Sequence, residues 1–272
     1  MTKSVLLLFT ITLGMAYAGT ESQYFTRKGM LPDIRFINSR YGWAVGRPVQ
    51  TGKSDSLNGS LLHSRDGGKT WERIVVPVVE PFTSVCFTNT THGWIVTSKG
   101  SVLNTIDGGR EWIIASVLEG ELRCVFFTDS LNGWVCGRAS AHSESVDAAH
   151  VGIIFCSTDG GYNWGKNTLP RNAGPINSLF FLDRQTGWAA GSVIRDSEKL
   201  GAVFHTEDGG SNWNIQFTTK PGILLLSIEF ISEQKGWVRG YSSPGFTEDS
   251  QFFKTENGGS SWAPCSRSEA SK

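Results

Sequence analysis

The chain has 272 residues, with 25 basic and 25 acidic side chains and therefore no formal net charge at pH 7. This balance excludes a strong overall field that would draw the protein to nucleic acid or to an anionic membrane, so any charged site must be a local patch. The length is sufficient for one large all-β domain after removal of an N-terminal leader.

The N-terminus is typical of a secretory signal peptide. Lys3 precedes an apolar run from Val5 to Met15, and the small-x-small sequence Ala16-Tyr17-Ala18 follows it. Because the apolar run is short for a bilayer span, we predict a cleaved signal peptide at residues 1–18. An uncleaved anchor is the alternative. No cysteine directly follows the predicted cleavage site, so we expect a secreted or periplasmic protein without a lipid anchor.

Two short motifs then recur five times each, in the same order. The first is a phenylalanine followed, seven residues later, by the tryptophan of a Gly-Trp pair, and it begins at Phe36, Phe87, Phe127, Phe181 and Phe230. The second is an octet with Ser or Thr first, Asp third, Gly fourth and fifth and Trp last, and its copies are 64–71, 105–112, 157–164, 206–213 and 255–262. All ten tryptophans belong to these motifs, so the sequence is built from five internal repeats.

Each repeat is expected to contain four strands. In the first repeat, strands at 33–37 and 42–45 flank a polar turn, a third strand enters the octet through Leu61-Leu62, and a fourth leaves it at 70–75. The octet itself is turn chemistry, because its hydroxyl and carboxylate can bond backbone N–H groups and its glycines supply positive φ.

The spacing of the octets is that of propeller blades, since their tryptophans lie 41, 52, 49 and 49 residues apart. We therefore predict an all-β fold, a single five-bladed β-propeller of four-stranded antiparallel blades within residues 19–272. The blades are expected at about 31–79, 80–118, 119–171, 172–220 and 221–266. Residues 23–26 are expected to add an outer strand beside the last strand at 262–264.

The loops at the two ends of the blades differ in regularity. The octets and the turns between first and second strands are short, and the meander places them at one end of each blade. The other end carries connections of variable length, where function usually lies on a regular scaffold. Their ranges are 47–60, 138–151, 192–201 and 241–250, against a minimal loop at 97–100.

Arginines gather at this variable end, either near the start of innermost strands or in the loops. Arginine presents a planar fork to carboxylates and protein surfaces, so these residues form our partner-binding hypothesis. Scattered solvated charges are the alternative interpretation. The predicted binding residues are Arg35, Arg47, Arg123, Arg138 and Arg195, with Arg171 in a loop at the same end.

The octet resembles the Asp-box, or bacterial neuraminidase, repeat. Its combination with the Phe and Gly-Trp motif is similar to the photosystem II stability and assembly factor family, from about Pro32 to Trp262. This resemblance implies a non-enzymatic propeller in the periplasm, or in the thylakoid lumen if the host is photosynthetic, where photosynthetic members help to assemble reaction-centre precursors. Those members have seven blades and an arginine-rich face, whereas this sequence holds five repeats.

The hypothesis that the protein is an enzyme rests on the octet carboxylates, because sialidases contain the same repeat. Equivalent turns around a propeller are too far apart for two of these carboxylates to act on one glycosidic bond. The last octet has an amide, which keeps the turn acceptor but would abolish catalysis. We therefore predict a structural role for Asp66, Asp107, Asp159, Asp208 and Asn257.

No catalytic residue, metal or cofactor is expected, since the histidines lack ligand spacing, and His142 and His150 are read as solvated loop residues. We read the repeated aromatic residues as interblade core rather than sugar platforms. The predicted function is an exported scaffold that binds another protein, at a membrane-protein complex or elsewhere, and not nucleic acid. A sialidase-like hydrolase and a carbohydrate-binding lectin are the alternatives.

Five cysteines remain after the predicted signal peptide, an odd number for an oxidising compartment. Cys136 and Cys156 fall on neighbouring strands of one predicted hairpin and could form a disulfide if their registers match. Isolated buried thiols are the alternative.

Overall fold

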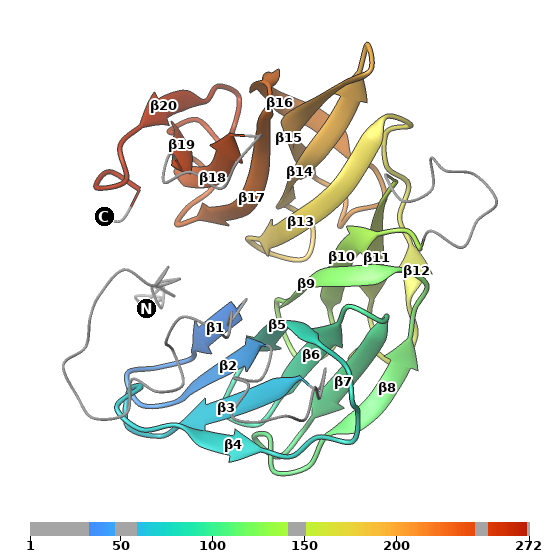
Figure 1. Cartoon of the computed structure of the whole chain (residues 1–272), viewed down its shortest axis with the longest axis vertical. Helices are drawn as coiled ribbons and strands as arrows, with labels where there is room; N and C mark the ends of the chain where they lie inside the picture. Colours follow the sequence, from blue (N-terminus) through green and yellow to red (C-terminus); the bar gives the residue numbers. More distant parts are fainter. Residues whose placement is uncertain (1–32, 47–58, 141–150, 243–249, 271–272) are drawn as a thin grey trace, which may run out of the picture. The chain divides into compact units, whose positions relative to one another are not determined.

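The structure is a computed structural model that describes residues 33–46, 59–140, 151–242 and 250–270. Within these ranges twenty strands form five antiparallel sheets of four, each in chain order (Figure 1). None of the described segments is a helix of the length and hydrophobicity that a bilayer crossing requires. The predicted signal peptide, the expected strand at 23–26, Arg47, His142 and His150 lie outside the described residues.

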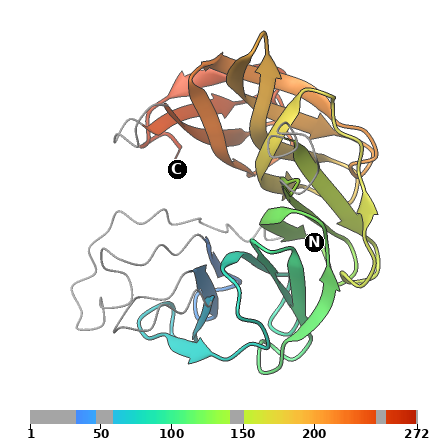
Figure 2. The ribbon, with the colours of Figure 1, turned by 45° about the vertical axis from the view of Figure 1, so that its right-hand side comes forward.

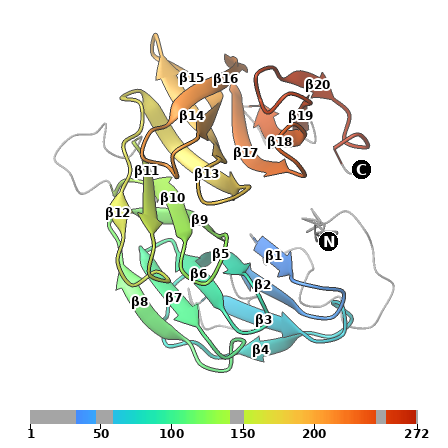
Figure 3. The same ribbon diagram turned by 180° about the vertical axis from the view of Figure 1, so that it is seen from behind.

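The chain divides into two compact units, Met1–Leu118 and Glu119–Lys272. The first unit holds two sheets, and Figure 3 shows the strands of the first one side by side in chain order. Its strands are β1 (Asp33–Phe36), β2 (Gly42–Gly46), β3 (Ser60–Ser64) and β4 (Glu72–Ile74), followed by β5 (Phe82–Phe87), β6 (Gly93–Thr97), β7 (Ser101–Thr105) and β8 (Ile113–Val117).

The second unit holds the other three sheets. The strands of the third sheet are β9 (Glu121–Phe127), β10 (Gly133–Arg138), β11 (Gly152–Ser157) and β12 (Gly165–Lys166). Those of the fourth are β13 (Ala173–Phe181), β14 (Gly187–Arg195), β15 (Glu198–Thr206) and β16 (Asn214–Pro221). Those of the fifth are β17 (Ile223–Phe230), β18 (Gly236–Ser242), β19 (Ser250–Thr255) and β20 (Ala263–Cys265).

The Phe and Gly-Trp motif is explained by strand register. In the fourth sheet Phe181 of β13 lies directly opposite Gly187 of β14, and a Cβ on Gly187 would overlap the Phe181 ring. Glycine is therefore required where the phenylalanine of the first strand folds over the second. The same overlap occurs in the other four sheets, between Gly42 and Phe36, Gly93 and Phe87, Gly133 and Phe127, and Gly236 and Phe230.

The aromatic side chains pack between successive sheets of a unit. Trp134 of β10 stacks on Phe181 of the next sheet, with ring centroids 3.7 Å apart, and Trp188 stacks on Phe230 at 3.8 Å. The tryptophan of the octet, Trp213, meets Phe181 edge-on at 5.9 Å. All five of these side chains are buried. The repeated aromatic residues are thus the core between the sheets, as the sequence predicts.

The octet turn is bonded to the turn between the first two strands of the same sheet. The N–H of Gly209 donates to the carbonyl of Gln185 at 2.8 Å, and the N–H of Gly160 donates to that of Leu131 at 2.9 Å. Equivalent bonds join Gly67 to Arg40, Gly108 to Thr91 and Gly258 to Gln234. Both kinds of turn therefore lie at one end of each sheet, and the variable connections lie at the other.

The register also shows that the Cys136–Cys156 disulfide hypothesis is wrong. Cys136 lies opposite Ile154, and Cys156 lies two positions away, opposite Trp134. All five cysteines are thiols in the structure, so it is the register that rules out this pair. Neighbouring strands are not sufficient for a bridge, because a disulfide needs directly facing residues.

Candidate functional site

In the third sheet the end opposite the octet turn carries two arginines joined by one carboxylate. Arg138 of β10 donates from Nε and Nη2 to Oε2 of Glu121, at 3.0 and 2.7 Å. Arg123 of β9 donates from Nε to the other oxygen, Oε1, at 3.3 Å. The side chains of Arg123 and Arg138 are 26% and 40% exposed, so both guanidinium groups reach solvent.

A β-bulge sets the position of Arg123. Cys124 pairs with Cys136 and Leu122 pairs with Gly137, so Arg123 is the extra residue on β9. A bulge bends its strand and re-aims a side chain. It thereby directs Arg123 to Glu121 in its own strand and to the next sheet.

The contact with the next sheet runs through Asn177. Arg123 Nη1 donates to Asn177 Oδ1 at 2.5 Å, and Asn177 Nδ2 donates to the carbonyl of Leu225 at 2.6 Å. The innermost strands of the three sheets in this unit, β9, β13 and β17, are therefore tied by one polar chain. Because exposed ion pairs contribute only about 0.2–1 kcal/mol each, the network positions the arginines more than it stabilises the fold.

Arg195 lies at the tip of the β14–β15 hairpin, opposite Glu198. Sequence reasoning expected a loop at 192–201, but the two strands extend to a turn of two residues, Asp196 and Ser197. These residues have φ of 51° and 65°, the left-handed conformation that a two-residue hairpin turn requires. The hairpin projects from its sheet (Figure 2). Arg195, at its tip, is exposed.

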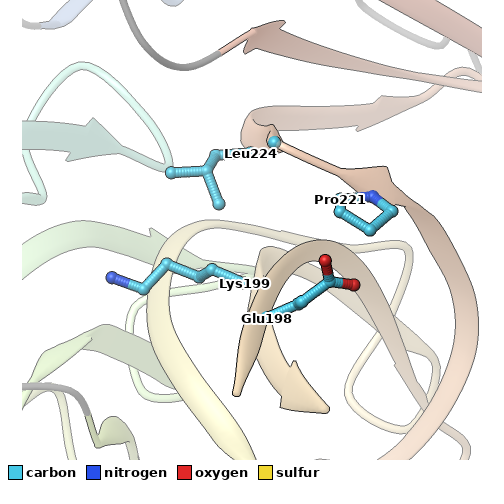
Figure 4. A pocket seen from close by; sticks show the side chains of 5 residues that line it. Glu198, Lys199, Pro221 and Leu224 are labelled. Carbon is cyan, nitrogen blue, oxygen red and sulfur yellow. The ribbon is translucent and has the colours of Figure 1, made fainter. Parts of the chain in front are cut away.

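A shallow pocket of about 270 Å³ lies beside the tip of this hairpin. Glu198 and Lys199 of β15 line it together with Pro221 at the end of β16, Gly222 between the strands, and Leu224 near the start of β17. In Figure 4 the Glu198 carboxylate lies toward Pro221, while the Lys199 side chain extends away from it. The pocket therefore has one acidic and one basic side chain next to the apolar residues Pro221 and Leu224.

The structure thus brings together two of the predicted binding residues, Arg123 and Arg138, and places Arg195 at the same end of the second unit. Arg35 belongs to the first unit, where its Nε lies 3.2 Å from Asp33. Arg171 is exposed in the connection before β13.

Sequence reasoning missed Glu121, Asn177 and the pocket. Asn177 was detectable, because it precedes Phe181 by four residues just as Arg123 precedes Phe127. A comparison of the repeats at that position would have linked them. The role of Glu121 depends on strand register, which the repeat motif does not specify. The pocket depends on how β16 is connected to β17, and this connection also lies outside the motif.

Each octet carboxylate accepts hydrogen bonds from groups of its own turn. Asp208 Oδ1 accepts from the hydroxyl of Thr206 at 2.8 Å and from the N–H of Asn212 at 2.9 Å. Hydrogen bonds from the backbone and side chain of Asn212 lower the pKa of Asp208 to about 2. Asn257 Oδ1 accepts from the hydroxyl of Thr255 and from the N–H of Ser261, both at 2.9 Å.

Each sheet is a four-stranded meander in chain order that ends in this turn and packs through the same aromatic pairs. These features define the Asp-box class of β-propeller proteins. The all-β class and the five four-stranded blades expected from the sequence are confirmed. The family model described as "Photosynthesis system II assembly factor YCF48" matches residues 21–113 and 70–224. The chain belongs to this family.

Two curated relatives are similar over part of their length. The chain is 27% identical over 199 residues to the photosystem II assembly lipoprotein Ycf48 of Synechococcus sp., covering 66% of this chain and 53% of the relative. It is 28% identical over 114 residues to the chloroplastic photosystem II stability/assembly factor HCF136 of Arabidopsis thaliana, covering 39% and 25%. The chain thus spans about half or less of the relatives it matches.

Solved structures share the fold at low identity. YCF48 from Cyanidioschyzon merolae has a TM-score of 0.51 at 18% identity, over 90% of this chain and 87% of that one. An ancestral GH74 enzyme has a TM-score of 0.63 at 14% identity, over 88% and 31%. A YCF48 bound to a D1 peptide has a TM-score of 0.48 at 19% identity, over 87% and 81%.

Proposed function

We propose that the chain is a non-catalytic scaffold that binds another protein during assembly of a membrane-protein complex. Membership of the assembly factor family supports this role, and the names of both curated relatives describe photosystem II assembly. The signal-peptide pattern and the lipoprotein and chloroplast relatives support a periplasmic or lumenal location.

The observation that carries the proposal is the network of Glu121, Arg123, Arg138 and Asn177. Arginines that are already oriented lose little side-chain entropy on binding, so they form a prepared surface for carboxylates and carbonyl groups of a partner. Their partial exposure leaves them accessible. Arg195 and the pocket at Glu198 extend this arginine surface across the second unit.

The binding test uses a labelled D1 peptide and measures its affinity by fluorescence anisotropy. Substitution of both Arg123→Ala and Arg138→Ala is expected to weaken binding at least tenfold, or about 1.4 kcal/mol, because two oriented cations are lost. The thermal transition should change little, since these ion pairs are partly exposed.

Arg184→Ala is the matched control. Arg184 also pairs with a carboxylate, Asp129, at 3.0 Å and is 65% exposed, but it lies in the β13–β14 turn at the octet end. Its loss should leave peptide affinity unchanged. Equal affinity of the wild type and the double variant would refute the arginine surface.

The absence of catalysis is tested separately, because the GH74 likeness shows only a shared fold. A glycosidase would need two carboxylates about 5–10 Å apart around a sugar, whereas Glu121 is engaged by two arginines. We expect no hydrolysis of xyloglucan or of a fluorogenic sialoside and no binding on a glycan array. Turnover or specific glycan binding would instead support the hydrolase or the lectin.

A further inference from the structure

Two buried cysteines face each other on adjacent strands of the third sheet. Cys124 of β9 is the direct register partner of Cys136 of β10, and the two side chains are 3% and 0% exposed. Directly opposed residues on antiparallel strands point to the same face of the sheet. The two sulfur atoms therefore lie together inside one blade.

The backbone geometry of this pair is that of a cross-strand disulfide. Opposed Cα atoms in an antiparallel pair lie about 4.5–5.5 Å apart, within the roughly 4.4–6.8 Å that disulfides span. Burial raises the pKa of the Cys136 thiol, and a hydrogen bond with the Cys124 side chain adds to the effect. Both groups are thiols in the structure, and Cys136 Sγ donates to the carbonyl of Ile176 at 3.7 Å.

The other cysteines offer no comparable pair. Cys156 is diagonal to Cys136, a relation that separates Cα atoms by about 7–8 Å. Cys86 lies on β5 of the first unit, and Cys265 lies on β20 of the last sheet. A single bridge between Cys124 and Cys136 would leave these three as thiols.

We propose that Cys124 and Cys136 form a structural disulfide when the chain folds in an oxidising compartment. The oxidant is a disulfide, either a small molecule or a thiol–disulfide oxidoreductase. One cysteine thiolate attacks the oxidant disulfide and releases one thiol, and the second cysteine thiolate attacks the mixed disulfide and releases the other. Both cysteines lose a proton, and two electrons reduce the oxidant disulfide to two thiols.

The reaction belongs to folding rather than to the native state. A buried thiol with a raised pKa is protonated and inaccessible, so it exchanges poorly. Oxidation therefore precedes complete closure of the β9–β10 hairpin. The bond then fixes the register beside the bulge at Arg123.

The test refolds the full chain from urea in oxidised and reduced glutathione, alkylates the remaining thiols and digests the protein with trypsin. Cleavage after Arg123 and Arg138 releases one peptide, 124–138, that contains both cysteines. We expect this peptide to be unalkylated and lighter by two hydrogen atoms than its reduced form. Cys86, Cys156 and Cys265 should be alkylated.

Matched variants separate the possible pairs. Cys156→Ser should leave the oxidised peptide unchanged, whereas Cys136→Ser should abolish it and expose Cys124 to alkylation. The oxidised wild type should unfold at higher urea than the reduced form, and the Cys124→Ser/Cys136→Ser variant should not respond to redox conditions. A fully alkylated 124–138 peptide after oxidative refolding, or a cross-link to Cys156, would overturn the proposal.

Discussion

The octet carboxylates accept several hydrogen bonds and have pKa values well below the ordinary range. The side chain and backbone of Thr70 lower the pKa of Asp66 to about 2, and those of Asn212 have the same result for Asp208. Asn257 instead donates from Nδ2 to the hydroxyl of Ser261 at 2.8 Å. Serine can accept from an amide, which explains why this repeat tolerates asparagine.

Stability should therefore fall in acid over a defined window. A carboxylate with a depressed folded-state pKa contributes fully above its unfolded pKa of about 3.9, and the contribution is lost as pH falls through the folded value, about 2 for Asp66, Asp159 and Asp208. Urea midpoints between pH 7 and pH 2 measure this loss.

Variants at the same positions provide the control for this acid effect. Replacing these three aspartates by asparagine should flatten the pH profile, and Asn257→Asp should steepen it, because Ser261 can donate to a new carboxylate. Identical pH profiles for the wild type and the triple variant would contradict the assignment.

At the scale of the element, three of the blades have a phenylalanine that two tryptophans and a glycine enclose, at Phe87, Phe181 and Phe230. Phe181 lies under Trp134, beside Trp213 and over Gly187. Phe181→Ala should lower the free energy of unfolding by about 3–5 kcal/mol, because it leaves a cavity between two sheets. Chemical denaturation measures this. Tyr162→Ala, at a side chain that is 49% exposed, should change it by less than about 0.5 kcal/mol, and an equal effect of both would refute the packing account.

The β14–β15 hairpin gives a second prediction for an element. Ser197 holds φ of 65°, a conformation that glycine adopts without strain. Ser197→Gly creates an Asp-Gly turn and should raise stability by up to about 1 kcal/mol, measured as a higher thermal midpoint. The same change at Ser211, where no positive φ occurs, should not stabilise. A lower midpoint for Ser197→Gly would show that the turn needs the serine side chain.

Sequence reasoning was most successful for features that repeat and least successful for departures from the repeat. Ten tryptophans at fixed spacing predicted five meanders, because the same Phe, Gly and Trp contacts recur in every sheet. The extended hairpin at Asp196 is such a departure, and it follows from local turn geometry. The bulge at Arg123 instead recurs four residues before the phenylalanine in four sheets, at Thr83, Arg123, Asn177 and Leu226, but it is a feature of strand register that the sequence pattern does not show.

At the scale of the whole molecule, the chain combines uniform turns at one end of its blades with a varied, arginine-bearing end in the second unit. Sequence established the class and family resemblance, and arginines were expected at the variable end. It could not show which of them share a carboxylate, since Glu121 and Arg138 are 17 residues apart and meet through strand pairing.

The most direct test of this account is amide hydrogen exchange of the full chain with and without a saturating D1 peptide. The peptide should slow exchange in segments 121–138, 195–199 and 221–225, which carry the arginine network, the hairpin tip and the pocket. Exchange in the octet turns should not change. Protection confined to the octet turns, or unchanged exchange in those three segments despite binding, would contradict the claim that the arginine-bearing end receives the partner.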